Sequence, residues 1–174
     1  MPDPDPEPLF YRWLAEHGDA VLKVARAYTI TDEDRRDLVQ EILLQLWRSM
    51  PRFEGRAGEL TWVYRVALNT ALGWRRGERR RRARQRPFLE FEDLPQTGPD
   101  GVQRAIRREV VERLHAAIRR LPKADAALVL LYLDDLSYRQ IAEVLGISEG
   151  NVGVKLNRAR KALGKLMEEE SHGP

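Results

Sequence analysis

The segment from Ser137 to Val152 constrains the fold most, because its polar, small and apolar residues have the spacing of two short helices joined by a tight turn. Ser137 and Gln140 form a capping-box pair that can begin the first helix. Gly146 can adopt the left-handed conformation that ends it. Ser148 can then cap a second helix, in which Val152 packs back on the first. The segment therefore predicts a helix-turn-helix, a motif that places its second helix in the major groove of DNA.

The second helix of this motif carries polar and basic side chains away from its apolar face. Such side chains can contact base edges and phosphates. The predicted DNA-contacting residues of this region are Arg139, Ser148, Asn151, Val154, Lys155, Arg158 and Lys161. A helical hairpin that only packs, with solvated charges on its outer face, is the alternative interpretation. The motif by itself does not distinguish a repressor from any other protein that reads DNA.

Helical periodicity runs through the rest of the chain, with one interruption. Residues 87–101 hold three prolines, two glycines and four acidic residues with no basic residue, which is typical of an extended acidic linker. Few segments alternate at period two, so we predict an all-α chain of two small helical domains joined by this flexible linker. The expected helices lie at about 9–28, 32–50, 60 onward, 102–121, 123–134 and in a tight pair up to 167, followed by a frayed tail at 168–174.

Composition excludes several other classes of protein. The chain has no cysteine, so it contains neither disulfides nor thiolate metal sites. Its histidines are scattered and its glycines do not form a phosphate loop, so we predict no catalytic residue, no metal and no cofactor. No apolar run approaches the roughly 20 residues that span a bilayer, and the N-terminus lacks the apolar core of a signal peptide. We therefore expect a cytoplasmic protein without direct membrane contact.

Arginine outnumbers lysine by 25 to 5, and eight of the arginines fall within residues 75–86. Guanidinium groups pair with phosphates, so a nucleic-acid partner would relieve their mutual repulsion, although a solvated basic tract would explain the segment equally well on its own. Trp62, Tyr64, Arg65 and Asn69 lie just upstream, after a glycine-bearing loop. Aromatic and amide groups beside a basic helix can hold unstacked bases, but a tryptophan such as Trp62 more often anchors a core.

Two sets of motifs occur in order along the chain. The first comprises the stretches Asp37–Arg48, Phe53–Gly55 and Thr61–Thr70, ahead of the arginine tract. The second comprises Leu121-Pro122 with the apolar helix after it, Ser137–Ala142 and Leu156–Leu163. Together they resemble the promoter-melting domain and the upstream-element-binding domain of the extracytoplasmic-function (ECF) RNA polymerase sigma factors. The resemblance covers nearly the whole chain and assigns residues 1–86 to sigma region 2, 87–101 to the linker and 102–174 to sigma region 4.

This resemblance implies a promoter-specificity subunit with no catalytic activity of its own. Its implied partners are core RNA polymerase, promoter DNA that it reads as duplex at the −35 element and as melted single strand at the −10 element, and an anti-sigma factor. The residues that match the polymerase-docking helix are Asp37, Gln40, Glu41 and Arg48. The residues that match the −10-binding surface are Glu54, Gly55, Arg56, Trp62, Arg65, Asn69, Arg75, Arg76, Arg79 and Arg80. The resemblance also implies that the linker threads toward the polymerase active-site cleft.

The chain departs from the family pattern in the second helix of the helix-turn-helix. Family members usually carry Thr, Lys and Ser where this chain has Asn151, Gly153 and Val154. Gly153 removes an expected phosphate contact, and Val154 can touch a thymine methyl but cannot donate a hydrogen bond. The resemblance therefore predicts the mode of DNA binding and leaves the promoter sequence open. A stand-alone helix-turn-helix regulator is the chief alternative, and it leaves Asp37–Arg48 and the arginine tract without a role.

Overall fold

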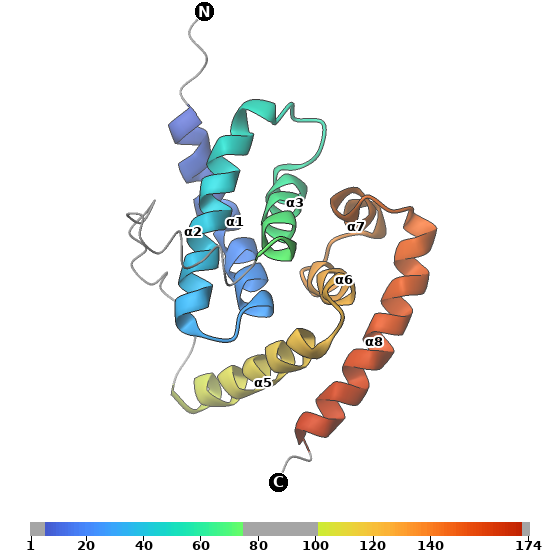
Figure 1. The fold of residues 1–174 in the computed structure, drawn as a ribbon. Helices are drawn as coiled ribbons and strands as arrows, with labels where there is room; N and C mark the ends of the chain where they lie inside the picture. The colour runs from blue at the N-terminus through green and yellow to red at the C-terminus, as the bar shows by residue number, and fades with distance from the viewer. Residues whose placement is uncertain (1–5, 75–100, 172–174) are drawn as a thin grey trace, which may run out of the picture.

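The computed structural model describes residues 6–74 and 101–171, and the described residues form helices and connecting turns without strands (Figure 1). The N-terminal half contains α1 (Pro6–Tyr28), α2 (Asp32–Ser49), the short 3-10 helix η1 (Met50–Arg52) and α3 (Glu59–Leu72). The C-terminal half contains α5 (Gly101–Arg120), α6 (Lys123–Leu133), α7 (Tyr138–Leu145) and α8 (Glu149–Ser171). The all-α prediction is confirmed. The arginine tract at 75–86 and most of the predicted linker, 87–100, lie outside the described residues.

The predicted end of the last helix is wrong. The sequence predicts a frayed tail at 168–174, but α8 continues to Ser171. Arg120, at the end of α5, accounts for the difference because its guanidinium contacts two carboxylates of this last turn, Glu169 at 2.7 Å and Glu170 at 3.4 Å. A tertiary contact of this kind leaves no signal in the local sequence.

In the N-terminal half, α1, α2 and α3 pack against one another around a shared apolar core (Figure 1). Thr31 begins α2 as predicted, since its Oγ1 accepts a hydrogen bond from the backbone N–H of Asp34 at 3.1 Å. The largest side chains of this core, fully buried, are Trp13, Leu38, Ile42, Leu43, Leu46, Tyr64 and Leu68. Burial of each large apolar side chain contributes about 1.5–3 kcal/mol, so this core fixes the mutual positions of the three helices.

In the C-terminal half, α6 is the central helix. It is apolar around most of its circumference, and Ala126 through Leu131 are all buried. A helix without a polar face requires neighbours on several sides. It contacts α5, α7 and α8 within its own half and α1 of the N-terminal half.

The two halves pack directly on each other. Helix α3 contacts α7, and α1 contacts α5 and α6, so one continuous cluster of buried apolar residues runs through both halves. The sequence predicted two modules on a flexible linker and gave no indication of this shared core. The structure therefore describes a closed arrangement of the two halves.

Candidate nucleic-acid and polymerase interfaces

The helix-turn-helix has the predicted local geometry. The Ser137 Oγ accepts from the Gln140 backbone N–H at 3.2 Å, and the Gln140 side chain accepts from the Ser137 backbone N–H at 2.8 Å. Gly146 has a φ of 67°, which places it in the left-handed region, and its N–H donates to the Ala142 carbonyl at 2.9 Å. Ser148 caps α8 by accepting from the Asn151 N–H at 3.2 Å. Each cap and turn that the residues predicted is therefore present.

Helix α8 separates an apolar face from a polar one. Val152, Leu156 and Ala159 are buried against the rest of the C-terminal half. The predicted contacts on the opposite face, all exposed, are Asn151, Val154, Lys155, Arg158 and Lys161. Arg139 on α7 is also exposed, with its guanidinium Nε 3.5 Å from the Glu143 carboxylate. The structure thus brings the predicted −35 residues onto one open surface of suitable charge for DNA phosphates.

The loop before α3 and the first turns of that helix form a second surface. Glu54, Gly55 and Arg56 are exposed, and the Glu54 carboxylate lies 2.8 Å from the Arg56 guanidinium. Gly55 has a φ of 69°, so the chain turns there through a conformation that favours glycine. Asn69 is exposed farther along α3. These side chains are accessible to a ligand in the closed arrangement.

Trp62 is half-buried and anchors this loop. Its indole N–H donates to Ser49 Oγ at 3.1 Å, and its ring meets the Phe53 ring edge-on with 5.5 Å between centroids. The Arg65 guanidinium lies 6.0 Å from the centre of the indole, within cation–π range. Trp62 therefore acts as an anchor of the core, one of the two roles that the sequence left open. The other role, base stacking on Trp62, stays a prediction.

Arg65 also contacts the other half of the molecule. Its guanidinium donates to the backbone carbonyl of Glu143 in α7 at 2.7 Å. A predicted DNA contact of α3 is thus engaged by protein in this arrangement. The remaining predicted −10 residues, Arg75, Arg76, Arg79 and Arg80, lie outside the described residues.

The predicted polymerase-docking residues follow one side of α2. Arg48 is exposed, Asp37 and Gln40 are half-buried, and Glu41 is buried. Glu41 Oε1 accepts a hydrogen bond from the Gln45 side chain at 2.7 Å. Of the four residues, Arg48 is the most accessible to a partner, and the docking roles of all four stay predictions.

The contact between the two halves contains polar residues that the sequence does not single out. The Asp134 carboxylate, at the end of α6, accepts a hydrogen bond from the buried Tyr64 hydroxyl at 2.6 Å and pairs with the Lys23 ammonium. Burial and the neighbouring carboxylate raise the pKa of Tyr64, so its hydroxyl keeps the proton that it donates. The sequence predicts for Tyr64 only an aromatic side chain near the basic tract. Its pairing with a residue 70 positions away has no local signature.

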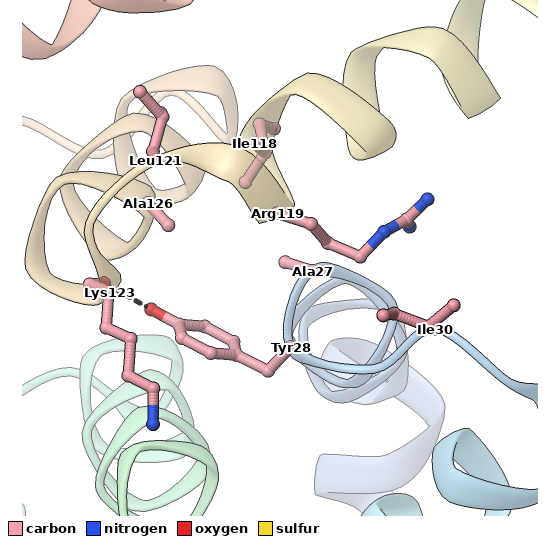
Figure 2. Close-up of a pocket in the computed structure, with 8 residues that line it drawn as sticks. All are labelled: Ala27, Tyr28, Ile30, Ile118, Arg119, Leu121, Lys123 and Ala126. Carbon is pink, nitrogen blue, oxygen red and sulfur yellow. Dashed lines mark hydrogen bonds between the residues drawn. The ribbon is translucent and has the colours of Figure 1, made fainter.

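A small hollow of about 170 Å³ lies at the junction of the two halves, between the end of α1 and the α5–α6 turn (Figure 2). Tyr28 borders it and donates its hydroxyl to the Lys123 carbonyl at 2.7 Å. Nearby, the Arg119 guanidinium donates to the Arg26 carbonyl at 3.4 Å. His115, on the preceding turn of α5, is buried, and burial followed by the charge of Arg26 lowers its pKa to about 4. The imidazole is therefore neutral at neutral pH.

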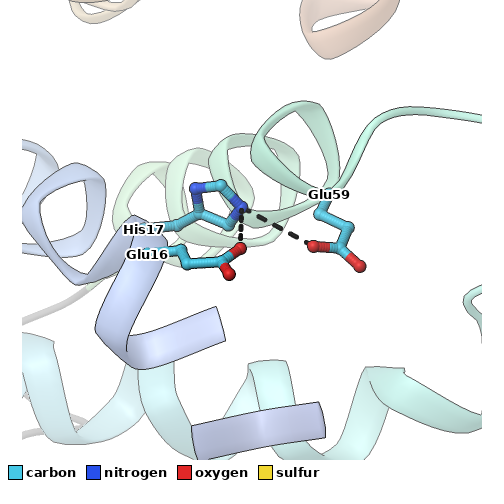
Figure 3. Close-up of side chains that lie close together, drawn as sticks. All are labelled: Glu16, His17 and Glu59. Carbon is cyan, nitrogen blue, oxygen red and sulfur yellow. Dashed lines mark ion pairs between the residues drawn. The ribbon is translucent and has the colours of Figure 1, made fainter. Parts of the chain in front are cut away.

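Glu16, His17 and Glu59 bring two carboxylates and an imidazole close together in the N-terminal half (Figure 3). The His17 Nε2 lies 3.9 Å from Glu16 and 3.8 Å from Glu59. Arg12 already neutralises this group, since its guanidinium donates to both oxygens of Glu59 at 2.6 and 3.0 Å. These hydrogen bonds lower the pKa of Glu59. The arrangement is that of an internal ion-pair cluster that joins α1 to the start of α3.

Comparison with known proteins matches both halves. Residues 13–82 match the model of Sigma-70 region 2, and residues 111–163 match the model of Sigma-70 region 4. The RNA polymerase sigma factor YlaC of Bacillus subtilis is 32% identical over 140 residues, which cover 78% of each chain. The ECF RNA polymerase sigma-E factor of Haemophilus influenzae is 30% identical over 150 residues, which cover 81% of this chain and 79% of that one. The chain belongs to the ECF RNA polymerase sigma factors.

Solved structures share the fold of this sigma factor. CnrH in complex with the cytosolic domain of CnrY has a TM-score of 0.65 at 23% identity and covers 93% of this chain and 89% of its own. RpoE in complex with the anti-sigma factor NepR from Bartonella quintana has a TM-score of 0.65 at 20% identity and covers 91% and 96%. The family match spans α2, the glycine loop and α3 on one side and the whole helix-turn-helix on the other. Among the helices of the described residues, none combines the length and the apolar character that a membrane span requires.

Proposed function

We propose that this sigma factor reads the −35 element as duplex DNA through α8 and the −10 element as a melted single strand through α3 and the loop before it. The observation that carries the proposal is the complete helix-turn-helix, whose outer face presents Asn151, Lys155, Arg158 and Lys161 to solvent. Amides can read base edges, and Lys and Arg pair with phosphates. A surface that holds single-stranded DNA better than duplex shifts the equilibrium toward melted DNA without consuming ATP.

We infer that the exposed loop around Gly55 and the exposed Asn69 of α3 supply contacts to unstacked bases of the melted strand. Removing a base from the stack costs a few kcal/mol, which contacts in a pocket must offset. The support is the accessibility of Glu54, Arg56 and Asn69 on the same half of the molecule. Arg75, Arg76, Arg79 and Arg80 would add phosphate contacts.

Run-off transcription with purified core polymerase on fragments of the source genome tests this function. We expect new discrete transcripts that depend on the protein and that weaken at least tenfold with Asn69→Ala or Arg158→Ala. Arg160→Ala is the matched control for Arg158, because Arg160 lies on the same helix but its guanidinium sits 5.0 Å from the Tyr132 ring. Gln103→Ala, an exposed amide on α5, is the control for Asn69. Specific duplex binding by the protein alone, with no transcripts, would instead establish the stand-alone regulator.

We further propose that α2 docks on core polymerase through the side that carries Asp37, Gln40, Glu41 and Arg48. The exposure of Arg48 supports this choice and gives the test. Arg48→Glu should weaken binding to core polymerase in a pull-down or anisotropy titration. Arg52→Glu, a charge reversal at another exposed arginine just beyond α2, should leave it near the wild-type value. Equal affinities of the two variants would remove α2 from the interface.

We also propose an anti-sigma partner for this chain. The two structural neighbours were solved as complexes, one with the cytosolic domain of CnrY and the other with the anti-sigma factor NepR. The apolar hollow at the junction of the halves, bordered by Arg119 and Lys123, could receive an apolar side chain from an acidic segment of such a partner. Copurification of the tagged chain from its source cells, followed by identification of the bound protein, tests the existence of the partner.

A further inference from the structure

We propose that the packing of α7 on α3 is an autoinhibitory contact that a polar latch holds closed. The latch consists of Asp134 at the end of α6, whose carboxylate accepts a hydrogen bond from Tyr64 of α3 and pairs with Lys23 of α1. The inference rests on the proposed function, because it concerns the access of the two DNA-binding surfaces to one promoter. In the closed form the two halves share a core, and in the open form they are joined only by the chain between them.

The size of the closed form makes opening necessary. By their numbering the −35 and −10 elements lie about 25 base pairs apart (35 − 10), which is about 85 Å along B-DNA at roughly 3.4 Å per base pair. A compact chain of this length has a radius of gyration of about 16 Å and is therefore roughly 40 Å across. One closed molecule cannot place α8 on one element and α3 on the other. The segment 75–100 can span at most about 90 Å if fully extended, so the covalent chain permits the separation.

The closed contact also engages part of the predicted −10 surface. The guanidinium of Arg65 donates to the Glu143 carbonyl of α7 at 2.7 Å and is therefore not directed at a phosphate. The predicted −35 face of α8 remains exposed in the same arrangement. Closure thus engages Arg65 of the predicted −10 surface, while Glu54, Gly55, Arg56 and Asn69 of that surface stay exposed.

The latch is polar at its centre and apolar around it. Tyr64 is fully buried, and its hydroxyl meets Asp134 at 2.6 Å, while the Asp134 side chain is 20% exposed and also pairs with Lys23. Removal of one partner leaves a buried polar group without its hydrogen bond, which disfavours the closed form. A hydrogen bond to a charged group is strong enough that its loss should raise the open population about tenfold.

Single-molecule energy transfer on the free protein tests the latch directly. The chain has no cysteine, so Ala15→Cys on α1 and Ala124→Cys on α6, both at exposed positions, give one dye site on each half. We expect the wild type to populate mainly a high-transfer state. Tyr64→Phe deletes the hydrogen bond to Asp134 and should increase the low-transfer population about tenfold. Asp134→Asn and Lys23→Met should increase it by less, because the amide oxygen of asparagine still accepts from Tyr64 and Lys23→Met removes only the ion pair. Asp135→Asn is the matched control, because this neighbouring residue is exposed and its φ of 58° suits asparagine as well as aspartate.

Two results would overturn the proposal: a wild type that is already mostly open, or latch variants whose populations equal those of Asp135→Asn. Far-UV circular dichroism and urea unfolding of every variant separate opening from loss of fold. Because this measurement uses neither DNA nor polymerase, it stands apart from the proposed function. Opening by the latch variants with no transcription from any form of the protein would refute the sigma activity and leave the latch. Transcription by the wild type with no effect of the latch variants on the distances would refute the latch and leave the activity.

Discussion

Replacement of Gly146 by alanine tests whether backbone conformation at the turn of the helix-turn-helix is the reason for this glycine. An added Cβ would meet no atom within 4 Å, so steric conflict with neighbours does not destabilise this variant. The backbone conformation does destabilise it, since the φ of 67° lies in the left-handed region, which costs an L-residue with a side chain about 1–2 kcal/mol. We therefore expect Gly146→Ala to lower the free energy of unfolding by about 1–2 kcal/mol.

Gly164 of α8 provides a comparison, because Gly164→Ala should raise the free energy of unfolding where Gly146→Ala lowers it. An added Cβ there also meets nothing within 4 Å, but the residue lies within a regular helix. Alanine at such a position stabilises a helix by up to about 1 kcal/mol relative to glycine. The two Gly→Ala variants should consequently differ by about 2–3 kcal/mol, which separates their Tm values by roughly 5–10 °C in a chain of this size.

Urea unfolding followed by circular dichroism measures both variants, and Gly146→Asn discriminates the cause. Asparagine is larger than alanine but tolerates the left-handed region, so it should be the milder substitution if φ is decisive. A Gly146→Ala variant as stable as the wild type, or a Gly146→Asn variant less stable than Gly146→Ala, would refute the conformational explanation.

Three further predictions concern other sites. Burial holds the pKa of His115 near 4, below its usual 6.5, so as the pH falls the unfolded chain binds a proton before the folded chain does. The free energy of unfolding should therefore be constant above about pH 6.5 and lower by about 2 kcal/mol at pH 5. His115→Leu should remove this loss, as measured by urea titrations at pH 6.5 and pH 5. Gly153→Lys should strengthen duplex binding and steepen the slope of log K against log salt by about one, because the added ammonium gains a phosphate contact. The side chain fits, since a Cβ at this position makes an ordinary 3.5 Å contact with the Tyr138 ring. An unchanged slope would place Gly153 off the DNA-binding face. Trp62→Phe removes the hydrogen bond to Ser49 and should cost about 1 kcal/mol of stability, whereas no loss in thermal unfolding would mean that the indole N–H does not anchor the loop.

The latch has a consequence for how a partner could regulate this sigma factor. The hollow between Tyr28 and the α5–α6 turn takes its lining from both halves, so it is complete only when they are closed. A protein that fills it binds the closed form better than the open one and shifts the population toward closure by its differential affinity. Binding of an anti-sigma partner and opening of the latch would then oppose each other thermodynamically.

The sequence by itself determined those features that residues close together in the chain decide. The caps at Thr31, Ser137 and Ser148 and the turn at Gly146 each depend on groups within about four positions, so their residue types predict the geometry directly. The apolar faces of the helices followed from periodicity in the same way. The separation of the predicted −35 residues of α8 from its buried residues could therefore be predicted without the structure.

Tertiary structure alone decided the relation between the halves. The partners of Asp134, the contact of Arg65 with Glu143 and the extension of α8 by Arg120 join residues 49 to 111 positions apart. Periodicity and capping carry no information about such pairs, because the free energy that selects them comes from surfaces that meet only after the helices have formed. The same limit explains the burial of Glu41 and the anchoring of Trp62, which depend on neighbouring helices. Interactions between residues close in the sequence determine the helices of this sigma factor, and packing between its two halves determines which faces of those helices remain exposed to a partner.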